Sequence, residues 1–257
     1  MKRTIFVLIL SLALTTGSSQ DWLRLLSGTF KIGKALTITD EELADAVEES
    51  VRAMDNSNTV CASNSEYTRR LKRITKGMTD AEGIPLNFKV YRTEELNAFA
   101  CPDGSVRVYS GLMDQLTDDE LLGVIGHEIG HVALRHSKKA WQEELMRSAA
   151  SDAVGAFSDI WAGLSNSAIG NITGAAISAK HSRVQENQAD DYGYEFLKKC
   201  NKNPWAMGLA FKKIKKLTGS NDSRYSTLMQ AFSSHPDFDE RIERMRRKAR
   251  EDGYPCR

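Results

Sequence analysis

Two histidines and a glutamate stand close together in the stretch "GVIGHEIGHVALRH", which runs from Gly123 to His136. On an α-helix, residues four apart lie on one face with their Cβ atoms about 5–6 Å apart, so His127 and His131 can bind one metal ion together. Glu128 projects about 100° further around the helix, where it can reach a water on that ion. The H-E-x-x-H spacing therefore predicts a metal-dependent hydrolytic site. The simpler interpretation is a surface helix with two hydrogen-bonded histidines.

The third histidine of this stretch is predicted to lie elsewhere. His136 follows His127 by nine residues, which places it about 180° around a continuous helix. It cannot then bind the same ion, and we expect it to be exposed to solvent near the helix C-terminus. The metzincin pattern requires Gly at position 134 and His at position 137. Because this chain has Leu134 and Ser137 there, that class is excluded.

A catalytic zinc site needs a third protein ligand and one open position. The segment "AKHSRVQENQADDYGYEFLKKC" offers a helix with one face made of Glu186, Ala189, Asp190, Gly193 and Leu197. Its small residues would let this helix pack closely against the first one, so that Glu186 reaches the metal. Asp190, one turn further on, could accept a hydrogen bond from a ligand histidine and orient it. A solvated Glu186 is the alternative, and we expect His181, which is not on this face, to be exposed.

The surrounding sequence predicts the elements that position these residues. "TDEELADAVEESVRAMD" is a helix pattern with Thr39 or Asp40 as its cap, and "NSEYTRRLKRITKGM" predicts a second helix. Three short strands are predicted at 87–91, 97–100 and 106–109, the last two joined as a hairpin by the turn sequence "CPDG". After the hairpin the pattern is helical to the end of the chain, beginning with the capping box "TDDE". We therefore expect a mainly α fold with a small β-sheet, which belongs to the α+β class.

The predicted hairpin also suggests how a substrate binds. An extended polypeptide can pair with an open sheet edge through backbone hydrogen bonds, and the "LNAFACPDG" strand is a candidate for such an edge. Asn97 and Phe99 could point toward the substrate, or they could be packed strand residues. Because this mode of binding depends on backbone more than on side chains, it favours unfolded protein segments or peptides as partners.

Composition and the N-terminal sequence indicate an exported globular protein. The 257 residues carry a formal net charge of +1 and show no basic stripe with interleaved aromatic residues, so we expect no nucleic-acid partner. "MKRTIFVLILSLALTTGSSQ" has a basic start, a short apolar run and a stretch of small residues, as a secretory signal peptide does. The apolar run is too short to span a bilayer core of about 30 Å. Cleavage is expected near Gly17 to Ser19, and a short membrane anchor is the alternative.

Export would place the four cysteines in an oxidising compartment, where an even number suggests disulfide bonds. We favour the pairs Cys61 with Cys101 and Cys200 with Cys256, and free, buried thiols are the alternative. No two cysteines form C-x-x-C, which argues against a thiolate zinc knuckle or a thioredoxin-type motif.

The motif pair "HEIGH" and "ENQAD" resembles the zinc metallopeptidases of the CaaX-prenyl-protease (HtpX/Ste-like) type, and most of all their bacterial periplasmic YggG-like branch. Further matching stretches are "NSEYTRRL", "LNAFACPDGSVRVYSGLMDQLTDDELLGVIGHEIGHVALRH" and "SSHPDFDERI", so the resemblance covers roughly residues 60–250. It implies a mainly helical gluzincin-type domain with a small sheet beside the active-site helix. It also implies one Zn²⁺ per chain, with His127, His131 and Glu186 as ligands and Glu128 as the catalytic base.

With this resemblance, the chain divides into a signal peptide (1–19), an N-terminal helical segment (20–58), a zinc metallopeptidase domain (59–250) and a C-terminal tail (251–257). We expect a periplasmic protein. The chain departs from membrane-embedded members, which carry transmembrane helices, and it lacks the lipid-attachment cysteine of some periplasmic members. Peripheral association with a membrane and the oligomeric state are therefore left open.

The expected activity is zinc-dependent endopeptidase cleavage of unfolded or damaged exported proteins. Zinc would lower the pKa of a water to about 7, and Glu128 would take a proton from that water and pass it to the leaving amine. One alternative is a chaperone-like holdase that keeps zinc as a structural ion without significant proteolysis. Another is a zinc hydrolase that acts on a non-peptide substrate, against which the predicted open strand argues.

His235, in "SSHPDFDERIERMRRKAR", has three candidate roles. Pro236 fits the first position of a helix, which would make His235 the helix cap or its neighbour. The resemblance includes an HP motif at this point and favours a catalytic role, in which His235 donates to the charge that develops on the substrate carbonyl. A histidine at this place could alternatively occupy the fourth position on zinc and keep the enzyme latent.

Overall fold

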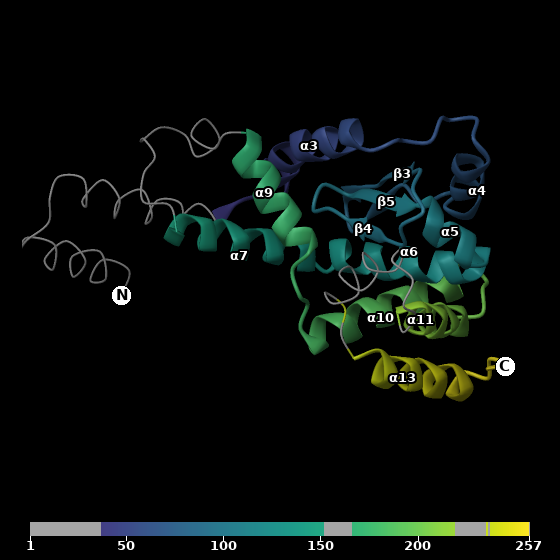
Figure 1. The fold of residues 1–257 in the computed structure, drawn as a ribbon. Helices are drawn as coiled ribbons and strands as arrows, with labels where there is room; N and C mark the ends of the chain where they lie inside the picture. Colours follow the sequence, from purple (N-terminus) through teal and green to yellow (C-terminus); the bar gives the residue numbers. More distant parts are fainter. Residues whose placement is uncertain (1–36, 152–165, 219–234, 236, 257) are drawn as a thin grey trace, which may run out of the picture.

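The computed structural model describes residues 37–151, 166–218, 235 and 237–256 (Figure 1). The predicted signal peptide, residues 1–19, lies outside the described residues. The helices are α3 (Asp40–Ser57), α4 (Glu66–Ile74), α5 (Ser110–Gln115), α6 (Asp118–Ala133), α7 (His136–Ser151), α9 (Asn166–Ile177), α10 (Arg183–Lys199), α11 (Trp205–Thr218) and α13 (Phe238–Glu251). The strands are β1 (Asp80–Ala81), β2 (Ile84–Pro85), β3 (Asn87–Tyr91), β4 (Ala98–Ala100) and β5 (Ser105–Tyr109).

A three-stranded sheet of order β3-β5-β4 confirms the three predicted strands and the hairpin. β3 runs parallel to β5 with Asn87 beside Ser105, and β4 runs antiparallel to β5 with Ala98 opposite Val108. Among the described strands β4 pairs only with β5, so it forms an edge of the sheet. The short β1–β2 ladder was not predicted, because two-residue strands carry no readable periodicity.

The sheet lies between two helical layers (Figure 1). Alternating side chains along β5 point to opposite faces, as the period of a strand requires. Val106 and Val108 join the cluster that contains Leu121 and Ile125 of α6. On the other face, Tyr91 and Phe99 belong to the cluster that contains residues of α3, α7 and α9. α10 and α11 lie beyond α6, and α13 forms the outermost layer (Figure 1). The mainly α class with a small sheet is therefore confirmed.

Helices α6 and α10 pack closely because glycines lie at their contact. A Cβ on Gly126 would come within 2.6 Å of Phe196 Cδ1, and a Cβ on Gly193 would come within 3.0 Å of the His127 backbone nitrogen. Any larger residue at these positions would push the two helices apart. The close approach that the small residues predicted is confirmed, and it brings the helix with His127 against the helix with Glu186.

Helix α3 is held to the sheet by one partly buried carboxylate. Asp55 accepts hydrogen bonds from Lys89 Nζ at 2.7 Å, Tyr91 Oη at 2.8 Å and Arg107 Nε at 2.8 Å. Burial raises the pKa of Asp55, but the hydrogen bonds from Arg107, Lys89 and Tyr91 outweigh it and lower the pKa to about 2. Asp55 is therefore ionised at neutral pH and holds two strands to α3. The helix starts at a capping box of Thr39 and Glu42, so of the two predicted caps, Thr39 and Asp40, the structure has Thr39.

The expected start of the last helix needs correction. α13 begins at Phe238 with Asp237 as its N-cap, so Pro236 does not occupy the first position of that helix. The backbone of Asp237 is left-handed, with φ of 68°, and its carboxylate accepts from Arg183 Nε at 3.0 Å. Asp237, the N-cap of α13, is thus ion-paired with the first residue of α10, a contact that the local sequence pattern does not report.

The cysteines are free thiols in this structure, so the predicted bridges Cys61–Cys101 and Cys200–Cys256 are absent from it. Cys101 is fully buried in the cluster beneath α3, whereas Cys61 packs against the cluster on the opposite face of the sheet. Within the described ranges, no helix combines the length and the apolar character needed to cross a membrane.

Candidate metal centre

Four side chains from three parts of the chain converge on one point. α6 presents His127 and His131 one turn apart, α10 presents Glu186 in its first turn, and His235 precedes α13. One ligand atom from each of the four lies within 4.8 Å of all the others. His127 Nε2 is 3.1 Å from His131 Nε2 and 3.3 Å from His235 Nδ1, and His131 Nε2 is 3.5 Å from Glu186 Oε1.

The spacing of these atoms fits a metal ion. A tetrahedral ion with bonds of about 2.0–2.1 Å separates its donor atoms by about 3.3 Å. The lone pair of His127 Nε2 faces this point, because the Nδ1 of the same ring donates a hydrogen bond to Asp190 Oδ1 at 3.0 Å. Imidazole nitrogens and a carboxylate oxygen at these separations are suited to bind one metal ion together.

Charge supports the same conclusion. The site buries three carboxylates, those of Glu128, Glu186 and Asp190, and one guanidinium, that of Arg241, which together leave a formal charge of −2. Isolated buried charge is costly, so an arrangement of this sign needs compensation inside the protein. A divalent cation held by the four donors would neutralise it.

Arg241 is a functional residue that the sequence analysis missed. It is 1% exposed and donates to both oxygens of Asp190, from Nε at 2.8 Å and from Nη2 at 2.6 Å. Its Nη1 lies 2.5 Å from Glu186 Oε2. Burial raises the pKa of Glu186, yet the neighbouring His235, His127 and Arg241 hold it at about 2. The only sequence signal for Arg241 was its place in the stretch "SSHPDFDERI". Several other arginines follow it near the C-terminus, so its type alone did not single it out.

Glu128 lies beside the donor set rather than within it. Its side chain is buried, and its Oε1 is 3.9 Å from His235 Nε2. Burial raises the pKa of Glu128, and the positive charge available on His235 and His127 opposes that rise. A carboxylate with a raised pKa next to a metal site is suited to accept and return a proton.

His136 is buried, so the prediction that it is solvated is wrong. α6 ends at Ala133, and the chain turns at Arg135, whose φ is 60°, before α7 begins at His136. The prediction that His136 lies about 180° around the helix from His127 holds only for one continuous helix. Because of the turn, His136 points back at His131, and the two Nδ1 atoms lie 3.1 Å apart.

His181 is half-buried, so the prediction that it is exposed is also wrong. It was predicted to be exposed because it is not on the helical face of Glu186, but it lies before the start of α10, where that helical face does not apply. Its ring stacks on that of His131 with centroids 4.0 Å apart. Burial lowers the pKa of His181 to about 3, and the charge of His235 lowers it in the same direction. All five histidines of the chain therefore gather at one place.

Comparison with known proteins agrees with this site. Residues 65–249 match the family described as Peptidase family M48. This chain belongs to peptidase family M48. It is similar to the metalloprotease YcaL of Escherichia coli K12, with 37% identity over 96% of this chain and 97% of that protein. It is also similar to the metalloprotease LoiP of the same organism, with 36% identity over 93% of both chains. A protease HtpX homolog of Methanopyrus kandleri is 31% identical over 73% of this chain and 69% of that protein.

Membership of the M48 family makes the protein a metalloendopeptidase, a hydrolase that uses a metal ion. In the described part of this M48 chain, the group of four donors is arranged so that it could hold a metal ion. Its helix α6 carries the H-E-x-x-H sequence, and its helix α10 carries the matching "ENQAD" sequence.

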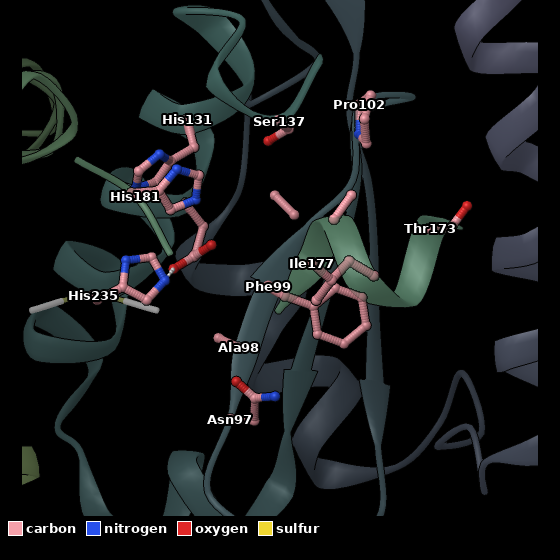
Figure 2. A pocket seen from close by; sticks show the side chains of 13 residues that line it. Asn97, Ala98, Phe99, Pro102, His131, Ser137, Thr173, Ile177, His181 and His235 are labelled. Atoms are coloured by element: carbon pink, nitrogen blue, oxygen red, sulfur yellow. Dashed lines mark ion pairs between the residues drawn. The ribbon is translucent and has the colours of Figure 1, made fainter. Parts of the chain in front are cut away.

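A cleft of about 550 Å³, part of it open solvent, runs from the M48 site along β4. Figure 2 shows the rings of His131, His181 and His235 on one side of this cleft and Phe99 and Ile177 on the other. Apart from the side chains of the metal site and His181, the lining residues are uncharged: Asn97, Ala98, Phe99, Ala100, Pro102, Ser137, Thr173, Ala176 and Ile177.

The edge of β4 that no described strand pairs with presents the backbone of Ala98 and Ala100. The carbonyl of Asn97 accepts from Tyr109 N at 2.9 Å, so the backbone of Asn97 is committed to β5. Phe99 pairs with Arg107 in the same register. Because backbone groups of alternate residues point to opposite sides of a strand, those of Phe99 also face β5, whereas those of Ala98 and Ala100 face away from it. The side chain of Asn97 lines the cleft, while Phe99 is largely buried and forms its wall.

Proposed function

We propose that this M48 metalloendopeptidase holds one zinc ion and hydrolyses peptide bonds in unfolded or damaged exported proteins. The observation that carries the proposal is the convergence of His127, His131, Glu186 and His235 beside buried Glu128, at the end of a cleft with an open strand. Each part has a role in such a reaction.

Zinc is the metal that suits the donor set best. Imidazole nitrogen and carboxylate oxygen are its usual ligands in hydrolytic enzymes, and it takes them at tetrahedral separations such as those found here. When bound, zinc supplies Lewis acidity that polarises a carbonyl and lowers the pKa of water. His127 is held for this task by Asp190, which Arg241 in turn holds by two hydrogen bonds.

Glu128 is proposed as the general base and acid. It takes a proton from the attacking water and returns it to the amine that leaves when the peptide bond breaks. Its burial keeps bulk water away and raises its pKa, which favours return of the proton. Among the described ion pairs, the one that includes Glu128 is with His235 Nε2, at a distance of 3.9 Å.

His235 is proposed as the fourth donor in the arrangement seen here. Its Nδ1 lies 3.0 Å from Glu186 Oε1 and 3.3 Å from His127 Nε2, within the donor set itself. This position supports a latent form, in which His235 fills the place that a substrate needs, more than a role as helix cap. Cleavage then requires His235 to leave the donor set, and in the displaced position it can donate to the substrate carbonyl.

The substrate is proposed to lie along β4 as an additional strand. Ala98 and Ala100 can donate and accept backbone hydrogen bonds there, while their side chains pack in the cluster that contains α6. Such pairing needs an extended segment, which unfolded proteins offer and folded proteins do not. The uncharged cleft places no requirement for a charged substrate side chain.

Export to the bacterial periplasm is proposed from the N-terminal sequence. Its basic start, apolar run and small residues are those of a signal peptide. N-terminal sequencing of the protein recovered from its native cell fraction tests this. A mature chain that starts near residues 18–20 is expected, and a chain that retains Met1 would contradict export by this route.

The central experiment compares wild type with Glu128→Gln. Both are expected to retain one zinc, because Glu128 is not in the donor set, while casein cleavage by the variant falls by about 10²–10⁴-fold with the loss of the proton acceptor. A chelator should abolish wild-type cleavage, and added zinc should restore it. Equal cleavage by the two proteins would rule out this mechanism. Wild type that binds zinc and suppresses aggregation of unfolded protein, but never cleaves it, would favour the holdase alternative.

A further inference from the structure

We infer that His136 and Gln188 form a hydrogen-bond relay that holds His131 in the tautomer able to bind the metal. The inference rests on the proposed function of His131 as a metal ligand and goes beyond it, because neither His136 nor Gln188 is a member of the donor set. Both act through His131, so they are positioning residues rather than catalytic ones.

The relay consists of two contacts in series. His131 Nδ1 lies 3.1 Å from His136 Nδ1, and both rings are buried, with exposed fractions of 2% and 6%. On its far side, His136 Nε2 lies 3.2 Å from Gln188 Oε1. Gln188 stands on α10, two residues after Glu186, so the relay also joins the two helices that supply the ligands.

The two Nδ1 atoms can form a hydrogen bond in only two ways when both rings are neutral. If His131 Nδ1 donates to His136, then His131 Nε2 carries a lone pair toward the donor set and can bind a metal ion. If His136 Nδ1 donates instead, then His131 Nε2 carries the hydrogen and cannot bind. The direction of this single hydrogen bond therefore separates a competent ring from an incompetent one.

Gln188 selects the competent direction. Its Oε1 accepts a hydrogen bond from His136 Nε2, so the hydrogen of the neutral His136 ring is placed at Nε2 and its Nδ1 is left as an acceptor. His131 must then donate from Nδ1. The face of the His131 ring is also fixed, because His181 stacks on it at 4.0 Å.

The two ligand histidines are thus oriented by different chemistry. His127 donates to the carboxylate of Asp190, which is charged and paired with Arg241. His131 donates to a neutral ring whose partner is a neutral amide. Outer partners of metal-bound histidines set ring orientation and tautomer, and their loss costs about 10–100-fold in metal affinity. The same range is expected for loss of the His136 acceptor.

Zinc affinity of the full chain tests the inference. Each protein is stripped of metal and titrated with Zn²⁺ against a chromophoric chelator. His136→Phe keeps an aromatic ring of similar shape without nitrogen and should bind zinc about 10–100-fold more weakly than wild type. His136→Asn offers an oxygen near the place of Nδ1 and should recover most of that loss. Gln188→Leu should weaken binding in the same direction as His136→Phe, but by less.

Asn187→Leu is the matched control, since Asn187 is the neighbour of Gln188 on α10 and its side chain is not part of the relay. It should bind zinc as wild type does. Melting temperatures of the metal-free proteins are measured alongside, and Gln188→Leu covers the case in which His136→Phe does not fold. Loss of affinity in Gln188→Leu with an unchanged melting temperature would support the relay.

The tautomers give a second measurement without enzyme activity. The chain has only five histidines, so two-bond ¹H–¹⁵N spectra of histidine-labelled, metal-free protein contain few signals. His136 is expected to carry its hydrogen on Nε2 and His131 on Nδ1, and the opposite tautomers would overturn the inference.

Failure of the relay and failure of the proposed function give different results. If wild type binds zinc, His131→Ala does not, and His136→Phe binds as tightly as wild type, then the relay is refuted and the ligand role of His131 stands. If His131→Ala binds zinc like wild type, then the ligand role itself is wrong and the relay falls with it.

Discussion

Glu186 is the one carboxylate in the donor set, and it comes from a different helix than the two histidines of H-E-x-x-H. Glu186→Gln keeps the shape of the side chain and removes its charge. It should lower zinc affinity by more than the ~10–100-fold that loss of an outer partner costs, because a ligand is lost directly. Zinc content after dialysis measures this.

The matched control is Asp191→Asn, on the next turn of the same helix. Asp191 pairs with Arg244 and Lys248 on the side of α10 that faces α13, away from the donor set. It should retain zinc. Full zinc occupancy in Glu186→Gln under the same dialysis would remove Glu186 from the site.

His235→Ala tests the latent arrangement. With its Nδ1 inside the donor set, His235 competes with substrate for the fourth position, so its removal should raise peptide cleavage at low substrate concentration. If His235 instead acts chiefly as a donor to the substrate carbonyl, turnover should fall by about 10²–10³-fold with zinc content unchanged. Wild-type turnover in this variant would return His235 to a structural role at the start of α13.

At this scale, spacing along the sequence singled out the residues that the structure gathers, namely His127, His131, Glu186 and Asp190. It failed for His136 and His181, because helical periodicity places a residue only while the helix continues. Arg241 was missed for another reason. Nothing in a sequence separates a buried arginine that holds two carboxylates from the exposed arginines beside it.

At the scale of elements, the glycine contact between α6 and α10 determines whether the ligands meet. Gly193→Val would place side-chain atoms against the backbone of His127, where even a Cβ lies 3.0 Å from its nitrogen. The helices must separate, so the variant should lose about 1–3 kcal/mol of stability from overpacking and should also bind zinc more weakly. Thermal melting and zinc titration measure the two effects.

Gly170→Val on α9 is the comparison for this change, because a Cβ at Gly170 meets no other atom within 4 Å. A substitution there should leave zinc affinity unchanged. If Gly193→Val binds zinc as tightly as wild type, then the distance between α6 and α10 does not control the site.

The Asp55 contact predicts how stability depends on pH. The pKa of Asp55 is lowered from 3.8 to about 2 in the folded protein, so the unfolded state binds the proton more readily. The stabilisation is therefore complete above about pH 4 and is lost as pH falls toward 2. It amounts to about 2 kcal/mol at neutral pH, since one pKa unit corresponds to about 1.4 kcal/mol.

Asp55→Asn should accordingly unfold at lower denaturant concentration than wild type at pH 7, and the difference should shrink between pH 4 and pH 2. A difference that stays constant over this range would show that the charge of Asp55 is not its cause. The capped helices and the strands were readable from local sequence, whereas this contact was not. It joins residues 52 positions apart, and no local pattern reports such a pairing.

At the scale of the whole molecule, a bound metal would join α6, α10 and the segment before α13. A ligand that binds only the folded state adds about 2.7 kcal/mol of stability at a concentration of 100 times Kd. For a domain of this size that corresponds to a rise of about 5–10 °C in Tm. Calorimetry with and without chelator should show this shift, and Glu186→Gln should show a much smaller one. Equal Tm values with and without chelator would show that metal binding does not stabilise the folded state.

The buried charge of −2 at the site is large beside the charge of the whole chain. Its 35 basic and 34 acidic residues nearly balance, giving +1 at pH 7. Removal of residues 1–19, as proposed, takes away Lys2 and Arg3 and no acidic residue, which leaves a formal charge of −1. A dication then reverses the sign of the mature protein's charge to +1. Metal-free and metal-loaded molecules would therefore differ by two formal charges, so the difference in their mobility in native electrophoresis at pH 7 reports the occupancy of the active centre.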